Sequence, residues 1–164
     1  PRRLEAEVIR DSILAASGQL DTTMFGPGTL DESHRRRSIY FMIKRSRLIP
    51  IMQVFDQPEP LVSQGSRPST TIAPQALLFM NNPQVVKWAH GLAQNLDASQ
   101  SDEAIRQLYL RTLTREPTLA ELTNSRAFFD SQSTSYSKEK NAAQLALADL
   151  CQVMLSLNEF IYLP

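Results

Sequence analysis

TTIAPQALLFMNNP, residues 70–83, is the stretch that decides the fold, because it predicts a change from extended chain to helix. Pro74 disfavours helix in the residue before it and presets the φ angle of a first helical turn. The apolar run that follows predicts a short helix over residues 75–80, buried on most sides. Asn82 is a favoured N-cap, and Pro83 is favoured at the first helical position. A second, longer helix is therefore expected to begin at Pro83.

Helical periodicity continues outward from this stretch in both directions. Thr118 and Glu121 form a capping box, and Ser101 is expected to cap another helix. Gly18 is suited to the position just after the first helix. The further helices are expected at residues 2–17, 50–55, 83–96, 101–113, 118–130 and 141–157, with a polar linker at 131–139. The last of them carries the clearest apolar seam, made of Ala143, Leu147, Leu150, Met154 and Leu157.

Two segments outside the helices predict a small β-ribbon. Residues 37–44, RSIYFMIK, alternate apolar and polar side chains as a strand does. A single strand leaves its backbone groups unpaired, so residues 69–73 are the expected partner. Residues 19–37 contain Gly-Pro-Gly and no periodicity, which predicts a surface loop. The expected fold is mainly α: one irregular helical bundle of about five to seven helices with a two-stranded ribbon, spanning residues 1–164.

Composition narrows the classes of function. Lys plus Arg number 17 and Asp plus Glu number 17, so the chain lacks the basic excess of most nucleic-acid binders. No apolar run approaches the roughly 18 residues of a membrane span, and the first residues lack the apolar core of a signal peptide. The single Cys151 excludes an internal disulfide, and it is expected to be a buried structural thiol. The chain is expected to be the C-terminal fragment of a larger multidomain protein.

Basic residues are concentrated where the predicted ribbon meets its loops. They are Arg35, Arg36, Arg37, Lys44, Arg45, Arg47 and Arg67. One interpretation is an anion-binding site, because guanidinium groups match the oxygens of sulfate, phosphate and carboxylate groups. The alternative is a set of ion pairs with the acids of the first helix or with Asp56 and Glu59.

The polar side of the first helix carries Arg3, Glu7, Arg10 and Asp11. Two carboxylates on one face are compatible with acid–base chemistry or a metal site. Arginines lie between the acids and no histidine joins them, which favours a solvated or inter-helix salt-bridge face. His90 is likewise expected at the edge of its helix rather than as a metal ligand, because no second histidine follows at helical spacing.

Six segments, in order along the chain, carry a resemblance to one known family. They are RRLEAEVIRDSIL at 2–14, RRRSIYFMIKRS at 35–46, VFDQPEP at 54–60, TTIAPQALLFMNNP at 70–83, LTREPTLAEL at 113–122 and ALADLCQVMLSLNEFIYL at 146–163. They resemble the planctomycete-specific domain of unknown function found toward the C-terminus of large exported proteins that often carry a planctomycete-type cytochrome c domain. The resemblance implies an exported, periplasmic or cell-surface location and assigns no activity to named residues. The chain has no Cys-x-x-Cys-His motif, so no cofactor is expected in this domain.

Two functions follow as alternatives. The first is a non-catalytic interaction or scaffolding module that docks against other domains of its own chain, in a protein associated with extracellular polymers. The second is part of an enzyme active site for an anionic, sulfated or carboxylated polysaccharide, with Gln75, Asn81 and Asn82 as polar contacts. The sequence contains no nucleophile elbow and no glycine-rich phosphate loop, and neither histidine belongs to a recognisable triad or metal motif. Nucleic-acid binding through the basic ribbon is the weakest alternative, because the total charge is balanced.

Overall fold

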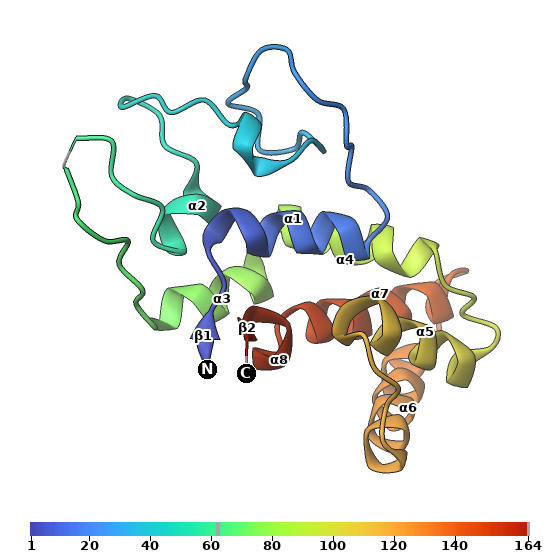
Figure 1. Ribbon diagram of the computed structural model, residues 1–164. Helices are drawn as coiled ribbons and strands as arrows, with labels where there is room; N and C mark the ends of the chain where they lie inside the picture. The colour runs from blue at the N-terminus through green and yellow to red at the C-terminus, as the bar shows by residue number, and fades with distance from the viewer. Residues whose placement is uncertain (62, 164) are drawn as a thin grey trace.

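The computed structural model describes residues 1–61 and 63–163, and over these residues the protein is mainly helical (Figure 1). The α-helices are α1 (Ala6–Ala16), α2 (Pro50–Val54), α3 (Ala73–Asn81), α4 (Pro83–Gln94), α5 (Ser101–Leu113), α6 (Leu119–Ser135), α7 (Ala142–Leu155) and α8 (Asn158–Ile161). The remaining elements are the 3-10 turn η1 (Ser38–Tyr40) and the strands β1 (Arg2–Arg3) and β2 (Tyr162–Leu163). The predicted mainly α class with a two-stranded sheet is confirmed.

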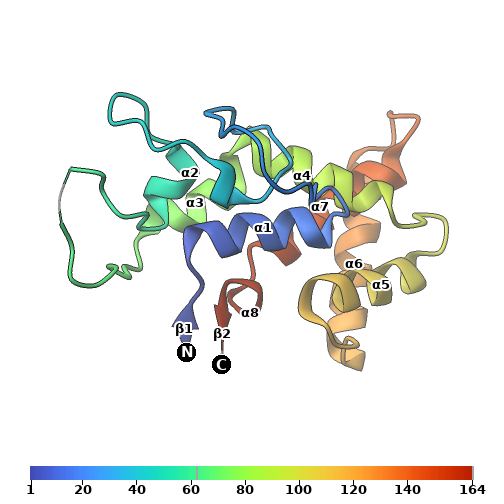
Figure 2. The ribbon, with the colours of Figure 1, turned by 45° about the horizontal axis from the view of Figure 1, so that its top comes forward.

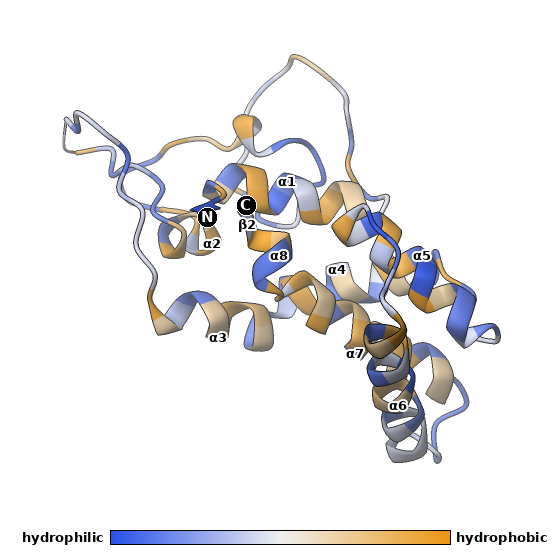
Figure 3. Cartoon of the chain, turned by 60° about the horizontal axis from the view of Figure 1, so that its bottom comes forward, coloured by the Kyte–Doolittle hydropathy of each residue, from blue (hydrophilic) through white to orange (hydrophobic). Residues whose placement is uncertain are grey.

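Helix α7 forms the centre of the core. It packs most extensively against α4 and α6, and its Leu147, Leu150 and Met154 are buried as the apolar seam predicts. Figure 3 colours most of α7 orange, whereas α6 mixes hydrophilic and hydrophobic segments. Burying one leucine of this seam contributes roughly 1.5 to 3 kcal/mol. The seam therefore fixes how the helices of the C-terminal half pack.

The two ends of the chain pair with each other. Arg2 lies opposite Leu163 and Arg3 opposite Tyr162 in an antiparallel sheet, so both termini lie side by side (Figures 1 and 2). Because Arg2 and Arg3 belong to this strand, α1 begins at Ala6 rather than at residue 2. The prediction of a two-stranded ribbon is correct, and its predicted location is wrong.

Residues 37–44 do not form a strand, and their alternation does not correspond to burial. Phe41 is buried, while Ile39 and Ile43 on the same predicted face are exposed. The backbone instead forms the turn η1, and Thr29 of the preceding loop bonds on either side of Phe41. Its N–H donates to the carbonyl of Tyr40 (2.9 Å), and its carbonyl accepts from Met42 N–H (2.8 Å).

The expected partner, residues 69–73, has its polar groups bonded elsewhere. The N–H of Thr70 donates to Asp56 Oδ2 (2.7 Å). The carbonyl of Thr70 accepts from Arg3 (2.6 Å) and from the side chain of Gln75 (3.1 Å). Side chains thus satisfy groups that a sheet partner would otherwise bond, and no ribbon forms here.

Capping residues set several helix boundaries as predicted. Asn82 accepts from Gln84 N–H (2.8 Å) at the start of α4, and Thr118 and Glu121 form the capping box of α6. Gly18, with a φ angle of 67°, ends α1 in the left-handed region where glycine is favoured. Ser101 is wrong as a cap, because it is the first residue of α5 and Gln100 occupies the cap position.

Helix α6 is longer than its sequence predicts. It continues to Ser135, through residues expected to form a polar linker. The hydroxyl of Thr134 donates to the carbonyl of Asp130 (2.9 Å), and that of Ser135 donates to the carbonyl of Ser131 (3.1 Å). These hydroxyls bond within the helix instead of competing with it, which is why the polar composition does not end it.

A long irregular segment, residues 17–49, connects α1 to α2. Figures 1 and 2 both show it as an excursion on one side of α1, interrupted only by η1 among the named elements. The prediction of a surface loop over residues 19–37 is confirmed. This segment and α1 together form the candidate site.

Candidate functional site

Arg10 of α1 is completely buried, with none of its surface accessible to solvent. Its Nη1 donates to the carbonyl of Arg36 (3.0 Å) and to Ser38 Oγ (3.2 Å), and its Nη2 donates to the carbonyl of His34. The prediction of a solvated or inter-helix salt-bridge face is therefore wrong at Arg10, whose partners are loop carbonyls and a serine hydroxyl. The residue points inward because the long loop folds back over α1 and offers backbone carbonyls to its guanidinium.

Aromatic rings complete the environment of Arg10. The guanidinium carbon lies 4.7 Å from the centroid of the Phe41 ring and 5.7 Å from that of Trp88. Such cation–π contacts contribute about 2 kcal/mol or more when they are desolvated. Burial lowers the pKa of Arg10 to about 10, and attraction to Asp11 opposes this change. The guanidinium therefore keeps its charge at neutral pH.

A second buried arginine, Arg3, secures the loop between α2 and α3. Its Nη2 pairs with Asp56 Oδ2 (2.6 Å) and its Nη1 donates to the carbonyl of Thr70 (2.6 Å). Asp56, at a φ angle of 61°, ends the turn after α2 in the left-handed region. Buried ion pairs of this kind fix geometry, and removing one partner leaves an uncompensated charge.

The loops positioned in this way leave an open groove along α1. It encloses about 690 Å³, a size typical of binding sites. We call it the α1 groove. Its lining residues are Glu5, Glu7, Val8, Asp11, Ser12, Ala15, Leu20, Arg37, Ser38, Ile39, Phe41, Ile43, Gln57 and Arg67.

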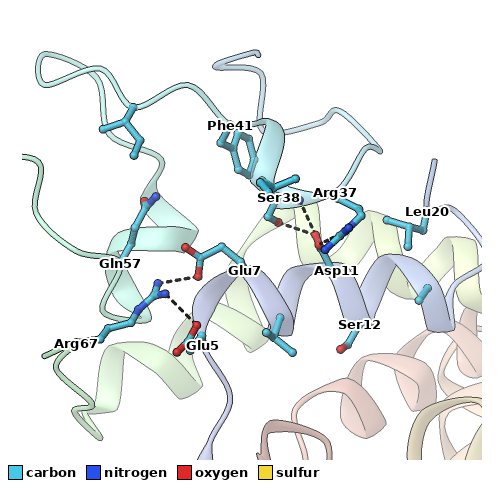
Figure 4. A pocket seen from close by; sticks show the side chains of 14 residues that line it. Glu5, Glu7, Asp11, Ser12, Leu20, Arg37, Ser38, Phe41, Gln57 and Arg67 are labelled. Atoms are coloured by element: carbon cyan, nitrogen blue, oxygen red, sulfur yellow. Dashed lines mark hydrogen bonds and ion pairs between the residues drawn. The ribbon is translucent and has the colours of Figure 1, made fainter. Parts of the chain in front are cut away.

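Charged side chains at one end of the α1 groove pair with one another. Arg67 donates to Glu5 (3.1 Å) and to Glu7 (2.6 Å), and Figure 4 shows it between the two carboxylates. Arg67 comes from the loop between α2 and α3, so these bonds join that loop to the first turn of α1. Its positive charge is therefore neutralised by the acids of the first helix.

Asp11, in the middle of the groove, bonds residues 37 and 38 of the long loop to α1. Its Oδ1 accepts from the N–H (2.8 Å) and the hydroxyl (2.7 Å) of Ser38, and its Oδ2 lies 3.8 Å from Arg37 Nε (Figure 4). The Ser38 hydroxyl also accepts from Arg10. This serine is buried and bonded on both sides, so its role is to hold η1 against α1.

The wall between these charged pairs is apolar and partly uncovered. Val8 is 43 % exposed, Ile39 72 % and Ile43 68 %. Val8, Ser12 and Ala15 follow at i, i+4 and i+7, so they form one stripe along α1. The small side chains of Ser12 and Ala15 leave room for close approach of another element.

The guanidinium of Arg36 is bonded within its own loop. Its guanidinium lies 3.5 Å from the centroid of the Tyr40 ring. It donates to the carbonyls of Thr23 (3.3 Å), Pro27 (3.2 Å) and Phe25. This arginine therefore closes the loop that contains Gly-Pro-Gly, and its donors are directed at backbone rather than at the α1 groove.

The structure does not gather the seven predicted basic residues at one point. Arg37 and Arg67 line the α1 groove, whereas Arg35 lines a separate groove beside α4. Lys44, Arg45 and Arg47 are exposed on a turn in which Arg47 N–H donates to the carbonyl of Lys44 (2.9 Å). With Arg36 bonded within its own loop, the cluster is divided among four places.

The predicted polar contacts lie outside the α1 groove. Gln75 is buried and donates to the carbonyls of Val54 (3.0 Å) and Thr70 (3.1 Å), which joins α3 to α2 and its loop. Asn82 caps α4, and Asn81 is exposed at the end of α3.

Other candidate groups occupy structural positions. Cys151 is buried in α7, and burial raises the pKa of its thiol well above the usual range. Among residues 1–61 and 63–163, no three His, Cys, Asp or Glu side chains are grouped as metal ligands would be. No helix in this described part of the chain is long and apolar enough to cross a membrane.

Sequence reasoning missed the burial of Arg10, which holds the loop of the α1 groove, and the second groove beside α4. Arg10 looks like one more member of a charged face, and only its stacking partners far along the chain show otherwise. Lys87 and His90 of α4 line the same groove as Arg35, which no local pattern indicates. The one signal that the sequence did show was the basic run at residues 35–37, which lies just before the buried Ser38.

Comparison with known proteins identifies one family. The family PSD1, described as a protein of unknown function (DUF1553), matches residues 1–129. No curated protein and no solved structure was found that matches the chain significantly.

Proposed function

The chain belongs to the PSD1 family of unknown function (DUF1553), and we propose that it serves there as a non-catalytic interaction module. One observation carries this proposal. In the α1 groove the arginines pair with carboxylates, while apolar side chains such as Ile39 and Ile43 are left exposed. Exposed apolar side chains rimmed by polar groups are typical of protein interaction sites.

The proposed occupant is an amphipathic helix from another domain of the same polypeptide. The stripe of Val8, Ser12 and Ala15 on one side and Ile39 with Ile43 on the other provide two apolar walls for its apolar face. Helix-in-groove recognition uses apolar side chains that recur at i, i+3, i+4 and i+7. The paired strands β1 and β2 lie beside the start of α1, where Glu5 lines the groove.

The charges of the α1 groove are already paired within the chain. Its three carboxylates, Glu5, Glu7 and Asp11, pair with Arg67 and Arg37, and Arg2 (3.7 Å from Glu5) and Arg10 (3.7 Å from Asp11) lie beside them as well. The proposed helix would therefore bind through its apolar face, and the charged rim would contribute mainly to specificity.

The wider setting of the module rests on the resemblance drawn from the sequence. It comprises export, a neighbouring cytochrome c domain and association with extracellular polymers. In that setting the domain would hold its neighbours in place, and the polymer or the cytochrome c domain would be bound by other parts of the protein.

The alternative is part of an active site that acts on an anionic polysaccharide. It would need an activated nucleophile or a separated acid and base in the α1 groove. Ser38 and Asp11 are the nearest arrangement, and both are already bonded, to each other and to Arg10 or Arg37. This bonding favours the interaction module.

Substitutions on the apolar wall test the proposal. Ile39→Glu and Ile43→Glu place a charge where the bound helix would pack, so each should weaken binding of the 164-residue chain to the neighbouring domains by about tenfold or more. Titration calorimetry with the neighbouring domains supplied separately measures this. Leu119→Glu is the matched control, because Leu119 is 82 % exposed on α6, and it should leave affinity unchanged.

Two results would overturn the proposal. One is the absence of any binding between the unaltered chain and its neighbouring domains. The other is an equal loss for Leu119→Glu and Ile39→Glu, which would show that the effect is not specific to the α1 groove. Circular dichroism of each variant verifies that it remains folded.

A further inference from the structure

A second groove lies between α4 and the loop that follows α1. It encloses about 650 Å³, and we call it the α4 groove. The side chains that matter for its chemistry are Arg35, Lys87, His90, Gln84, Gln94 and Asn95. None of the described residues that line it is a carboxylate. In this respect it is the opposite of the α1 groove, where acids neutralise the arginines.

The backbone around Arg35 is held in place on all sides. Buried Arg10 donates to the carbonyls of His34 and Arg36, the residues before and after it. The carbonyl of Arg35 itself accepts from Asp21 N–H (2.9 Å). Three consecutive carbonyls are thus bonded, so the loop presents the Arg35 side chain to the groove from a fixed position. Such fixed placement reduces the ordering cost of binding.

Helix α4 provides the opposite wall from one of its faces. Gln84, Lys87, Gly91 and Gln94 recur at i, i+3, i+7 and i+10, which places them along one stripe of the helix. Gly91 leaves space in the middle of this stripe, and the side-chain amide of Gln19 occupies part of it: a Cβ atom at position 91 would lie 1.6 Å from Gln19 Nε2. The groove is therefore lined by amides between basic groups.

Asn95, which also lines the groove, joins the end of α4 to the end of α1. Its side-chain amide donates to the carbonyl of Ser17 at the end of α1 (2.8 Å) and to that of Gly91 within α4 (3.0 Å). The first of these bonds holds α4 against the point where the loop that carries Arg35 leaves α1.

From this arrangement we propose that the α4 groove binds a sugar that carries a sulfate or phosphate ester. Arg35 offers a planar pair of donors that matches two oxygens of such a group, and Lys87 adds a point charge. The amides of Gln84 and Gln94 can both donate to and accept from sugar hydroxyls. The groove volume suits a ligand of one or two sugar units.

The proposal concerns a surface different from the α1 groove and does not depend on docking there. Arg67 is excluded from the ester site, because Glu5 and Glu7 already neutralise it. Of the seven basic residues clustered in sequence, the proposal assigns ester binding to Arg35 alone and adds Lys87 and His90 from α4.

Calorimetric titration of the 164-residue chain with four probes tests the proposal. The probes are a sulfated disaccharide, the same disaccharide without sulfate, a sugar phosphate and inorganic sulfate. The sulfated disaccharide or the sugar phosphate should bind, and the one that binds more tightly identifies the kind of ester. The unsulfated disaccharide should bind at least about tenfold more weakly than this ester, because it lacks the charge-assisted hydrogen bonds. Inorganic sulfate should bind more weakly than the better ester, because it makes no contact with the amides.

Variants locate the binding in the α4 groove. Arg35→Ala and Lys87→Ala should each weaken binding of the better ester by about tenfold, and Arg35→Lys should restore only part of the loss because it lacks the planar donor pair. Arg45→Ala removes the same charge from an exposed turn and is the matched control, with an expected change of less than about twofold. Ile39→Glu, in the α1 groove, should leave ester binding unchanged, which separates this proposal from the docking proposal.

Three outcomes would overturn it: no binding of either ester, equal binding with and without the ester group, or equal losses for Arg45→Ala and Arg35→Ala. The last would indicate nonspecific attraction to the basic loop. The side chains of Arg35, Arg45 and Lys87 are exposed, so these variants are expected to fold. Thermal melts verify this.

Discussion

The guanidinium of Arg10 lies over the ring of Phe41, with its central carbon 4.7 Å from the ring centroid. His34 packs edge-on against the same ring at 4.5 Å, and its carbonyl accepts from Arg10. These three residues join α1 to both ends of the segment 34–41. The loop that forms one wall of each groove is thereby fixed by a single buried cation.

Substituting Arg10 should destabilise the protein strongly. Arg10→Ala leaves two backbone carbonyls without their donor and creates a cavity beside Phe41, so we expect a loss of roughly 3 to 5 kcal/mol in the free energy of unfolding. Arg37→Ala, on a half-exposed ion pair, should cost about 1 kcal/mol or less. Urea melts of both variants measure the difference. Equal losses would show that Arg10 does not organise the loop.

His34 should make stability depend on pH. Its two ring nitrogens are buried without a partner among the described residues. Burial and the nearby charge of Arg10 lower the pKa of His34 from 6.5, so below that pH the unfolded chain binds a proton more readily than the folded chain does. The free energy of unfolding should therefore fall as pH drops from 6.5 through the lowered folded-state pKa, and this contribution is fully present above 6.5.

Replacing the imidazole removes this dependence. His34→Phe keeps an aromatic ring against Phe41 and cannot take up a proton, so its free energy of unfolding should fall less between about pH 7 and pH 5 than that of the unaltered protein. Urea melts at several pH values compare the two slopes. Identical slopes would mean that protonation of His34 costs no more in the folded protein than in the unfolded chain.

The cap at Asn82 predicts a smaller effect. Asn82→Ala removes the side-chain oxygen that accepts from Gln84 N–H, which should cost about 1 kcal/mol. Asn81→Ala, one residue earlier and exposed, is the matched control and should change stability by less than about 0.5 kcal/mol. Thermal melts of the pair are sufficient. A larger loss at Asn81 than at Asn82 would contradict the observed cap.

The helices could be predicted because their signals are local. The pair Asn82-Pro83 and the capping box at Thr118 act within one turn, and the seam of α7 repeats within one helix. The strands could not be located, since β1 and β2 come from opposite ends of the chain. Alternation at residues 37–44 predicted a strand, whereas tertiary packing buried Phe41 and left Ile39 and Ile43 exposed.

The site was less predictable for the same physical reason. Charge counting found the basic residues at 35–37, but it could not show that Glu5 and Glu7 neutralise Arg67 or that Arg35 and Lys87 line the same groove. Arg10 shares a helix with acids, so its sequence neighbours suggested a solvated face. Its burial depends on carbonyls and rings supplied by residues 34–41 and by Trp88.

Hydrogen–deuterium exchange on the longer polypeptide that the proposal assumes, called here the full polypeptide, tests the interaction module most directly. Compared with the isolated 164-residue chain, the full polypeptide should show slower exchange at backbone amides of α1 and residues 38–43, because a docked helix covers the α1 groove. Ile39→Glu in the full polypeptide should return exchange there to the isolated level, while α6 exchanges equally in all three. Identical exchange at α1 and residues 38–43 in the full polypeptide and the isolated chain would contradict the account.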